Sequence, residues 1–199
     1  MSSLMDLVSK QIGREQVDQI ASQLGSSREQ VESAIGMALP TLLGAVARKA
    51  DDAGQSAELH SSLQHHDDGI LDQTGQLFGG QPAPALQSFG GVGDLLGSML
   101  GGRQGRVEQG IGKASGMSGT QVASLLAMLA PLVMGAISRQ AKTDKLDSDG
   151  LSGMLRGEKK EIENQATGGL LAGLLDQDGD GDFDFQDVMK LGMKRLFGK

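Results

Sequence analysis

The sequence predicts an all-α fold, in which two copies of one helical repeat pack into a compact domain that is followed by a C-terminal helix-loop-helix. Three observations predict it. The chain repeats itself at a constant spacing of 91 residues, which indicates a duplicated unit. The repeated stretches carry apolar residues at helical spacing. A short segment near the C-terminus places many aspartates between two amphipathic stretches.

The composition favours closely packed helices. The 199 residues include no Trp or Tyr, five Phe, ten Met and 31 Gly, and the apolar fraction is 38%. A core without large aromatic side chains must be built from Leu, Val, Ile, Met and Ala. Helix backbones can approach closely where Gly and Ala line the contact.

Charge and cysteine content exclude several classes of function. The formal net charge of −7 argues against nucleic acid, which needs a basic face. The absence of Cys excludes disulfides and thiolate chemistry but does not fix the compartment. The N-terminus shows no signal peptide, so a cytoplasmic location is expected, and non-classical export stays open.

The repeat is clearest where residues 25–50 align with residues 116–141. This ungapped alignment has 11 identities in 26 positions. We therefore expect a two-repeat helical domain over 1–142, with repeats at about 1–52 and 92–142. A linker rich in Gly, Pro and polar residues, 53–91, joins the two repeats.

Each repeat is predicted to contain a shorter helix, at 14–24 and 104–115. Gly25 and Gly116 follow these helices and are suited to end them.

A capping box then begins the next helix of each repeat. Ser27 precedes Gln30 by three residues, and Ser118 precedes Gln121 in the same way. Each Ser hydroxyl can accept a first-turn N–H while the Gln reaches back to the cap.

The central helices contain Pro40 and Pro131, which are expected to kink both helices at the same place. Residues 122–137 are apolar nearly all round, which is typical of a buried central helix. The alternative is a membrane-inserting segment, but 16 residues fall short of the ~20 that a spanning helix needs.

Residues 176–187, within predicted C-terminal helices over 143–199, have the spacing of an EF-hand calcium loop. Side chains at positions 1, 3, 5, 9 and 12 and the carbonyl at position 7 bind the ion, and position 6 is Gly. Here position 6 is Gly181 and position 8 is the apolar Phe183. The predicted metal ligands are Asp176, Asp178, Asp180, Asp182, Asp184 and Asp187.

Asp187 departs from the loop pattern, which has Glu at position 12. Its shorter side chain puts bidentate binding in doubt, and losing one oxygen favours a six-coordinate ion. Because the other positions match the calcium loop, Ca²⁺ is the expected cofactor, and the departure at Asp187 leaves Mg²⁺ as the alternative ion. An acidic, glycine-rich turn without a metal is the other interpretation.

The linker holds every histidine of the chain. His60, His65 and His66, with Asp67 and Asp68, could form a transition-metal site. A solvated polar linker is the favoured interpretation. Residues 64–75 also resemble a degenerate copy of the aspartate loop with too few carboxylates for calcium.

The sequence resembles the YidB-like family, bacterial all-helical proteins that carry a domain of unknown function. The resemblance rests on the segments "LMDLVSKQIG", "ALPTLLGAVAR", "HHDDGILDQTGQLFGG" and "RVEQGIGKASGMSGTQVASLLAMLAPLVMGAI". It covers most of residues 1–142 and implies a compact helical fold. It implies no activity.

No catalytic motif was found, and an enzyme is not expected. "GMSGT" lacks the last glycine of a nucleophile elbow, and "GIGKAS" lacks the spacing of a phosphate loop. The expected function is therefore non-catalytic calcium binding with a structural or interaction role. The alternative is a membrane-active or self-assembling protein that exposes helix 122–137, with calcium as a trigger. A protein partner or a homo-oligomer stays open.

Overall fold

The computed structural model describes residues 3–64, 71 and 92–167, and every regular element in them is helical. The all-α prediction is confirmed. The helices are α1 (Leu4–Gln11), α2 (Arg14–Leu24), α3 (Arg28–Asp51), α4 (Ala53–Gln64), α7 (Val92–Leu100), the 3-10 turn η2 (Gly101–Arg103), α8 (Gln104–Ser115), α9 (Gly119–Thr143) and α10 (Ser148–Thr167).

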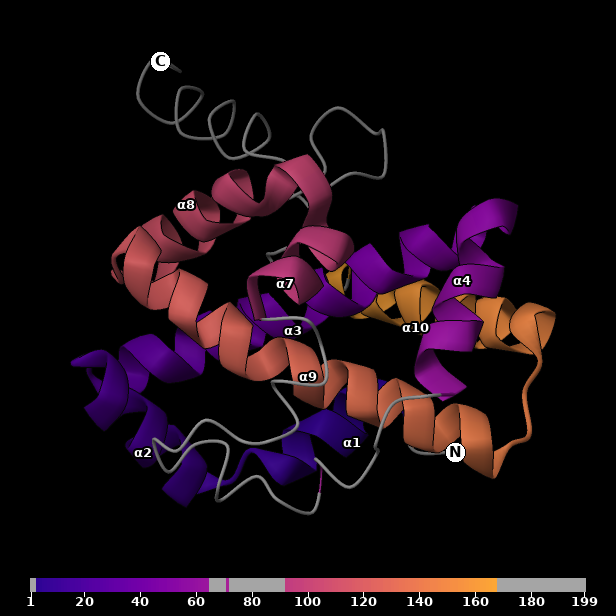
Figure 1. The fold of residues 1–199 in the computed structure, drawn as a ribbon. Helices are drawn as coiled ribbons and strands as arrows, with labels where there is room; N and C mark the ends of the chain where they lie inside the picture. Colours follow the sequence, from indigo (N-terminus) through magenta and orange to yellow (C-terminus); the bar gives the residue numbers. More distant parts are fainter. Residues whose placement is uncertain (1–2, 65–70, 72–91, 168–199) are drawn as a thin grey trace.

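The two longest helices, α3 and α9, form the centre of the fold (Figure 1). Helix α9 contacts α1, α2, α3, α4, α7 and α8, and α10 packs against α3 and α4. The apolar stretch 122–137 is therefore a central helix enclosed by its neighbours, as predicted.

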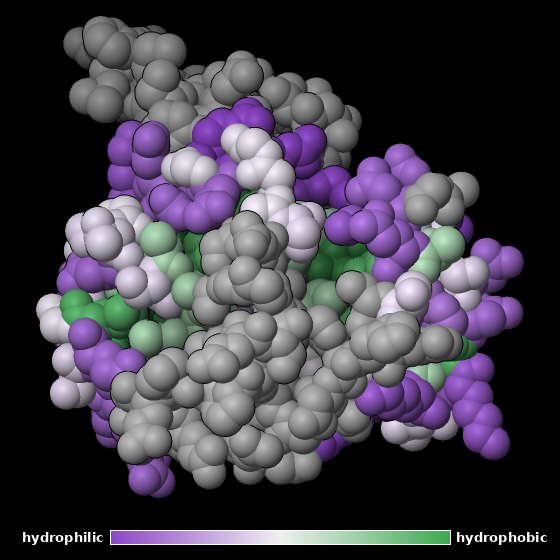
Figure 2. All heavy atoms as spheres, in the orientation of Figure 1, coloured by the Kyte–Doolittle hydropathy of each residue, from purple (hydrophilic) through white to green (hydrophobic). Residues whose placement is uncertain are grey.

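The core is aliphatic, as the composition predicts. All five Phe lie outside the described ranges, so the described helices hold no Phe, Tyr or Trp. On the face shown in Figure 2, hydrophilic residues predominate over α8 and α4, and hydrophobic surface shows between them. The largest fully buried side chains are Leu4, Ile20, Leu42, Leu43, Leu125, Leu126, Leu129, Leu132, Ile137, Leu151 and Leu155.

Both predicted capping boxes are present. Ser27 Oγ accepts the N–H of Gln30, and Gln30 Oε1 accepts the N–H of Ser27 at 3.0 Å. Ser118 and Gln121 make the same pair of bonds, with 2.8 Å between Ser118 N and Gln121 Oε1. Local sequence thus determines where α3 and α9 begin.

The predicted helices 14–24 and 104–115 match α2 and α8, and both end at glycine. Gly25 has a φ of 60° and Gly116 a φ of 75°, a left-handed conformation that costs Gly little and other residues more.

The capping glutamines also join the two halves of the chain. Gln30 Nε2 donates to the carbonyl of Gly116 at 2.7 Å, and Gln121 Nε2 donates to the carbonyl of Leu24 at 2.8 Å. Each central helix therefore begins against the C-terminal end of the short helix from the other half, in a reciprocal arrangement.

Helices α3 and α9 continue through Pro40 and Pro131. Neither proline has an N–H to donate to the carbonyl four residues earlier. That Pro40 and Pro131 kink the two helices at the same place stays a prediction.

The first part of the predicted linker 53–91 is helical, because α4 extends to Gln64. Leu59 and Leu63, one turn apart, are buried and anchor α4 to the core.

Candidate functional site

The predicted calcium loop lies outside the described residues. Its six ligands, at 176–187, follow α10, whose last residue is Thr167. His65, His66, Asp67 and Asp68 of the alternative metal site also lie outside the described ranges. Within the described ranges, no three His, Asp or Glu side chains form a group suited to a metal ion.

His60 is the one histidine among the described residues, and it lies on α4. The side chain is half-buried, and its Nε2 lies 3.0 Å from the carbonyl oxygen of Leu146. A carbonyl only accepts, so Nε2 carries the hydrogen in this bond. His60 therefore joins α4 to the connection between α9 and α10.

Helix α10, which leads toward the aspartate loop, is bonded to the first half of the chain. Ser152 Oγ donates to the carbonyl of Ala50 at 2.9 Å, and Arg156 Nε lies 2.5 Å from Asp51 Oδ1. Leu151 and Leu155 are fully buried in the common core. Helix α10 therefore belongs to the same packed body as the other described helices.

Glu158 of α10 caps the N-terminus of α1. Its Oε1 accepts the N–H of Leu4 at 2.9 Å, across a separation of 154 residues. A carboxylate at a helix N-terminus satisfies a free N–H and interacts favourably with the helix dipole.

The Glu158 carboxyl is half-buried, and burial raises its pKa above the ordinary value of Glu. Hydrogen bonds from the backbone N–H groups of Leu4 and Met5 oppose the shift. The negative charges of Glu161 and Asp6 add to it.

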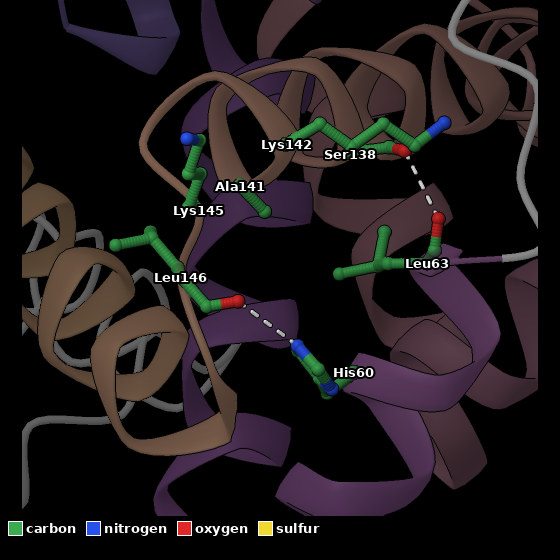
Figure 3. A pocket seen from close by; sticks show the side chains of 7 residues that line it. All are labelled: His60, Leu63, Ser138, Ala141, Lys142, Lys145 and Leu146. Atoms are coloured by element: carbon green, nitrogen blue, oxygen red, sulfur yellow. Dashed lines mark hydrogen bonds between the residues drawn. The ribbon is translucent and has the colours of Figure 1, made fainter.

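A pocket of about 260 Å³ opens where α4 faces the end of α9 (Figure 3). On one side of the pocket, Ser138 Oγ donates to the carbonyl of Leu63 at 3.0 Å. On the other side, His60 Nε2 donates to the carbonyl of Leu146. None of the lining residues is acidic. They are His60, Leu63, Ser138, Ala141, Lys142, Lys145 and Leu146.

Lys145 gives the edge of this pocket an unusual backbone. Its φ is 51°, the one positive φ at a non-glycine residue in the described part of the chain. The N–H of Leu146 bonds the carbonyl of Ala141 at 2.9 Å, and the N–H of Lys145 bonds that of Lys142 at 3.3 Å. This is a Schellman ending of α9, with Lys in the position that usually holds Gly.

The sequence analysis missed both this pocket and the contact of Glu158. The pocket depends on how α4 packs against α9, and Glu158 depends on a contact between opposite ends of the chain. The buried pair Leu59 and Leu63 is a helical signal that could have revealed α4 itself.

Helices α3 and α9 are long and apolar enough to cross a membrane, with mean hydropathies of 1.2 and 1.8 over their most apolar stretches. In α9, 67% of that stretch is buried inside the protein. The core helix of a soluble protein has the same length and composition.

Comparison with known proteins gives a family but no activity. The family model described as "Bacterial protein of unknown function (DUF937)" matches residues 6–140. No curated protein and no solved structure matches the chain significantly. The match runs from α1 into the last turn of α9, which is more than half of the chain. The chain therefore belongs to this family of bacterial proteins of unknown function.

Proposed function

We propose that this protein is a non-catalytic helical protein that binds Ca²⁺ through the loop 176–187. The observation that carries the proposal is the spacing of six aspartates around Gly181. Hard carboxylate oxygens at this spacing can surround one cation, as Ca²⁺ requires. Without an ion, six negative charges in twelve residues repel one another.

The anchoring of α10 suggests what calcium binding does. Residues 168–175 separate α10 from the loop, and Ser152, Arg156 and Glu158 hold α10 against the first half of the chain. An ion bound by the loop would favour the folded state, because metal-binding energy adds to folding energy. The role proposed for calcium is therefore structural.

Titration of metal-stripped protein by calorimetry, first with Ca²⁺ and then with Mg²⁺, tests the proposal. Calcium at a hundred times its dissociation constant should stabilise the folded state by about 2.7 kcal/mol. For a chain of this size, that corresponds to a rise in melting temperature of roughly 5–10 °C. Because Asp187 replaces Glu, Mg²⁺ is expected to compete better than at an ordinary EF-hand.

Variants of the loop provide the control. Asp176→Ala and Asp180→Ala should lower the melting temperature in calcium and leave it unchanged in chelator. Gln177→Ala, at a position that is not a ligand, should behave as wild type in both conditions. Equal destabilisation in chelator would show that the aspartates act without a metal.

We also infer that the two halves of the helical body are duplicated copies, with the kinks at Pro40 and Pro131 as part of the repeat. Besides the 11 identities, the matching capping boxes, the glycine ends of α2 and α8, and the reciprocal glutamine bonds support this inference. Within the family of unknown function, we also propose that the protein is related to the YidB-like proteins.

A membrane-active or self-assembling protein is the second candidate. The length and hydropathy of α3 and α9 favour it, since a helix of 25 residues is about 37 Å long and the hydrocarbon core about 30 Å thick. Exposing α9 would first require its neighbours to separate. Flotation of the protein with liposomes, with and without calcium, distinguishes the two: a buried core helix gives no binding in either condition.

A further inference from the structure

We propose that the pocket between α4 and the end of α9 binds a short aliphatic carboxylate, with Lys145 as the cation that holds the carboxylate group. This site is separate from the loop 176–187, and the proposal does not depend on calcium.

The size of the pocket sets the size of the ligand. A cavity of about 150 Å³ holds benzene, which has six non-hydrogen atoms. In proportion, the pocket of about 260 Å³ has room for a ligand of about ten non-hydrogen atoms. Hexanoate and octanoate fall in this range.

The inner surface of the pocket suits an aliphatic chain. Leu63 is 2% exposed and Ala141 8% exposed, and both line it, together with Leu146. The polar groups of the walls are already bonded to each other: Ser138 bonds the carbonyl of Leu63, and His60 bonds the carbonyl of Leu146. A ligand that enters therefore meets apolar surface without breaking a hydrogen bond.

The edge of the pocket is positively charged. Lys142 and Lys145 lie on either side of Ala141 (Figure 3). The nearest acids in sequence do not line the pocket: Asp144 accepts from Gln140, and Asp147 accepts from the N–H of Gly150. Lys142 has an interaction with another group, so Lys145 is assigned as the anchor for the anion.

The backbone of Lys145 is a second observation at the same edge. A left-handed conformation costs a non-glycine residue roughly 1 kcal/mol, and such strain gathers at binding sites. Glycine would fit this helix ending better, but glycine could not supply a charge. Binding of an anionic ligand by the ammonium group would explain why this position holds lysine instead of glycine.

NMR titration of methyl-labelled protein in chelator tests the proposal, with hexanoate, hexanol and hexylamine as ligands. Hexanoate should give saturable shifts at the methyl groups of Leu63, Ala141 and Leu146. Its affinity should exceed that of hexanol about tenfold, the effect of one charge-assisted hydrogen bond. Hexylamine should not bind. Equal binding of hexanol, or hexanoate shifts confined to other residues, would overturn the proposal.

Lys145→Gly separates loss of the ligand from loss of the fold. The variant should bind hexanoate about tenfold more weakly and yet melt at a higher temperature, since glycine relieves the backbone strain. Lys10→Ala, an exposed lysine on α1, is the matched control and should bind as wild type. Unchanged hexanoate affinity in Lys145→Gly would contradict the assigned anchor.

Discussion

The reciprocal glutamine bonds predict how strongly the two halves of the chain hold each other. Each glutamine uses Oε1 to cap its own helix and Nε2 to reach the other half, at 2.7 Å for Gln30 and 2.8 Å for Gln121. Replacing either with Glu keeps the capping oxygen and removes the N–H donor. Gln30→Glu and Gln121→Glu therefore test the bond between the halves separately from the cap.

The magnitude follows from one lost hydrogen bond at each position. A typical bond contributes about 1 kcal/mol net, and less where water can replace it. The bond of Gln30 is exposed and that of Gln121 half-buried, so we expect losses of about 0.5–1 and about 1–1.5 kcal/mol, respectively. The melting temperature should fall by about 2–4 °C per kcal/mol.

Urea and thermal unfolding followed by circular dichroism measure these losses, and Gln16→Glu is the matched control. Gln16 holds the same third position of its helix, α2, and carries the same amide. Acidic residues in a first turn are slightly stabilising, so the control should unfold at or just above the wild-type midpoint. If both test variants have the same unfolding midpoints as the control, the two interhelical bonds contribute nothing to stability.

Three further predictions concern single contacts. Burial raises the pKa of Glu158 above its unfolded value, so between the two pKa values this carboxyl binds more protons in the folded state, and its contribution to the free energy of unfolding rises as pH falls. Glu158→Gln keeps the acceptor for Leu4 and removes this contribution, so the stability of wild type relative to the variant should increase in urea titrations from pH 7 to pH 4. Lys145→Gly should stabilise the protein by about 0.5–1 kcal/mol in the same assay, and a lower midpoint would contradict the strain at φ 51°. Ser138→Ala should cost about 1–2 kcal/mol because the carbonyl of Leu63 loses its buried partner; an unchanged midpoint would mean that water replaces the hydroxyl.

Local features of the fold could be predicted from the sequence because their signals are local. Ser27 and Ser118 start the central helices, and Gly25 and Gly116 end the preceding ones, through contacts within a few residues. The periodic apolar residues of the central helices likewise identify the buried face.

Contacts between distant parts of the chain could not be predicted in this way. A capping box does not show which helix end its glutamine will also reach, and nothing near Glu158 in the sequence points to Leu4. Helix α4 was missed because its composition is polar and its buried positions are few. For the loop 176–187, the sequence is the source of every argument, since the described residues end at 167.

The cap that Glu158 gives to α1 has a consequence for synthesis of the protein on the ribosome. Helix α1 is synthesised before its capping residue Glu158, which lies 154 residues after Leu4. At about 5–20 residues per second, that delay is roughly 8–30 s. During this time the N–H of Leu4 lacks its final partner, whereas the N–H of Asp6 can already bond Ser3. A nascent chain stalled before residue 158 should therefore be cleaved by protease near its N-terminus, and the completed chain should be protected there.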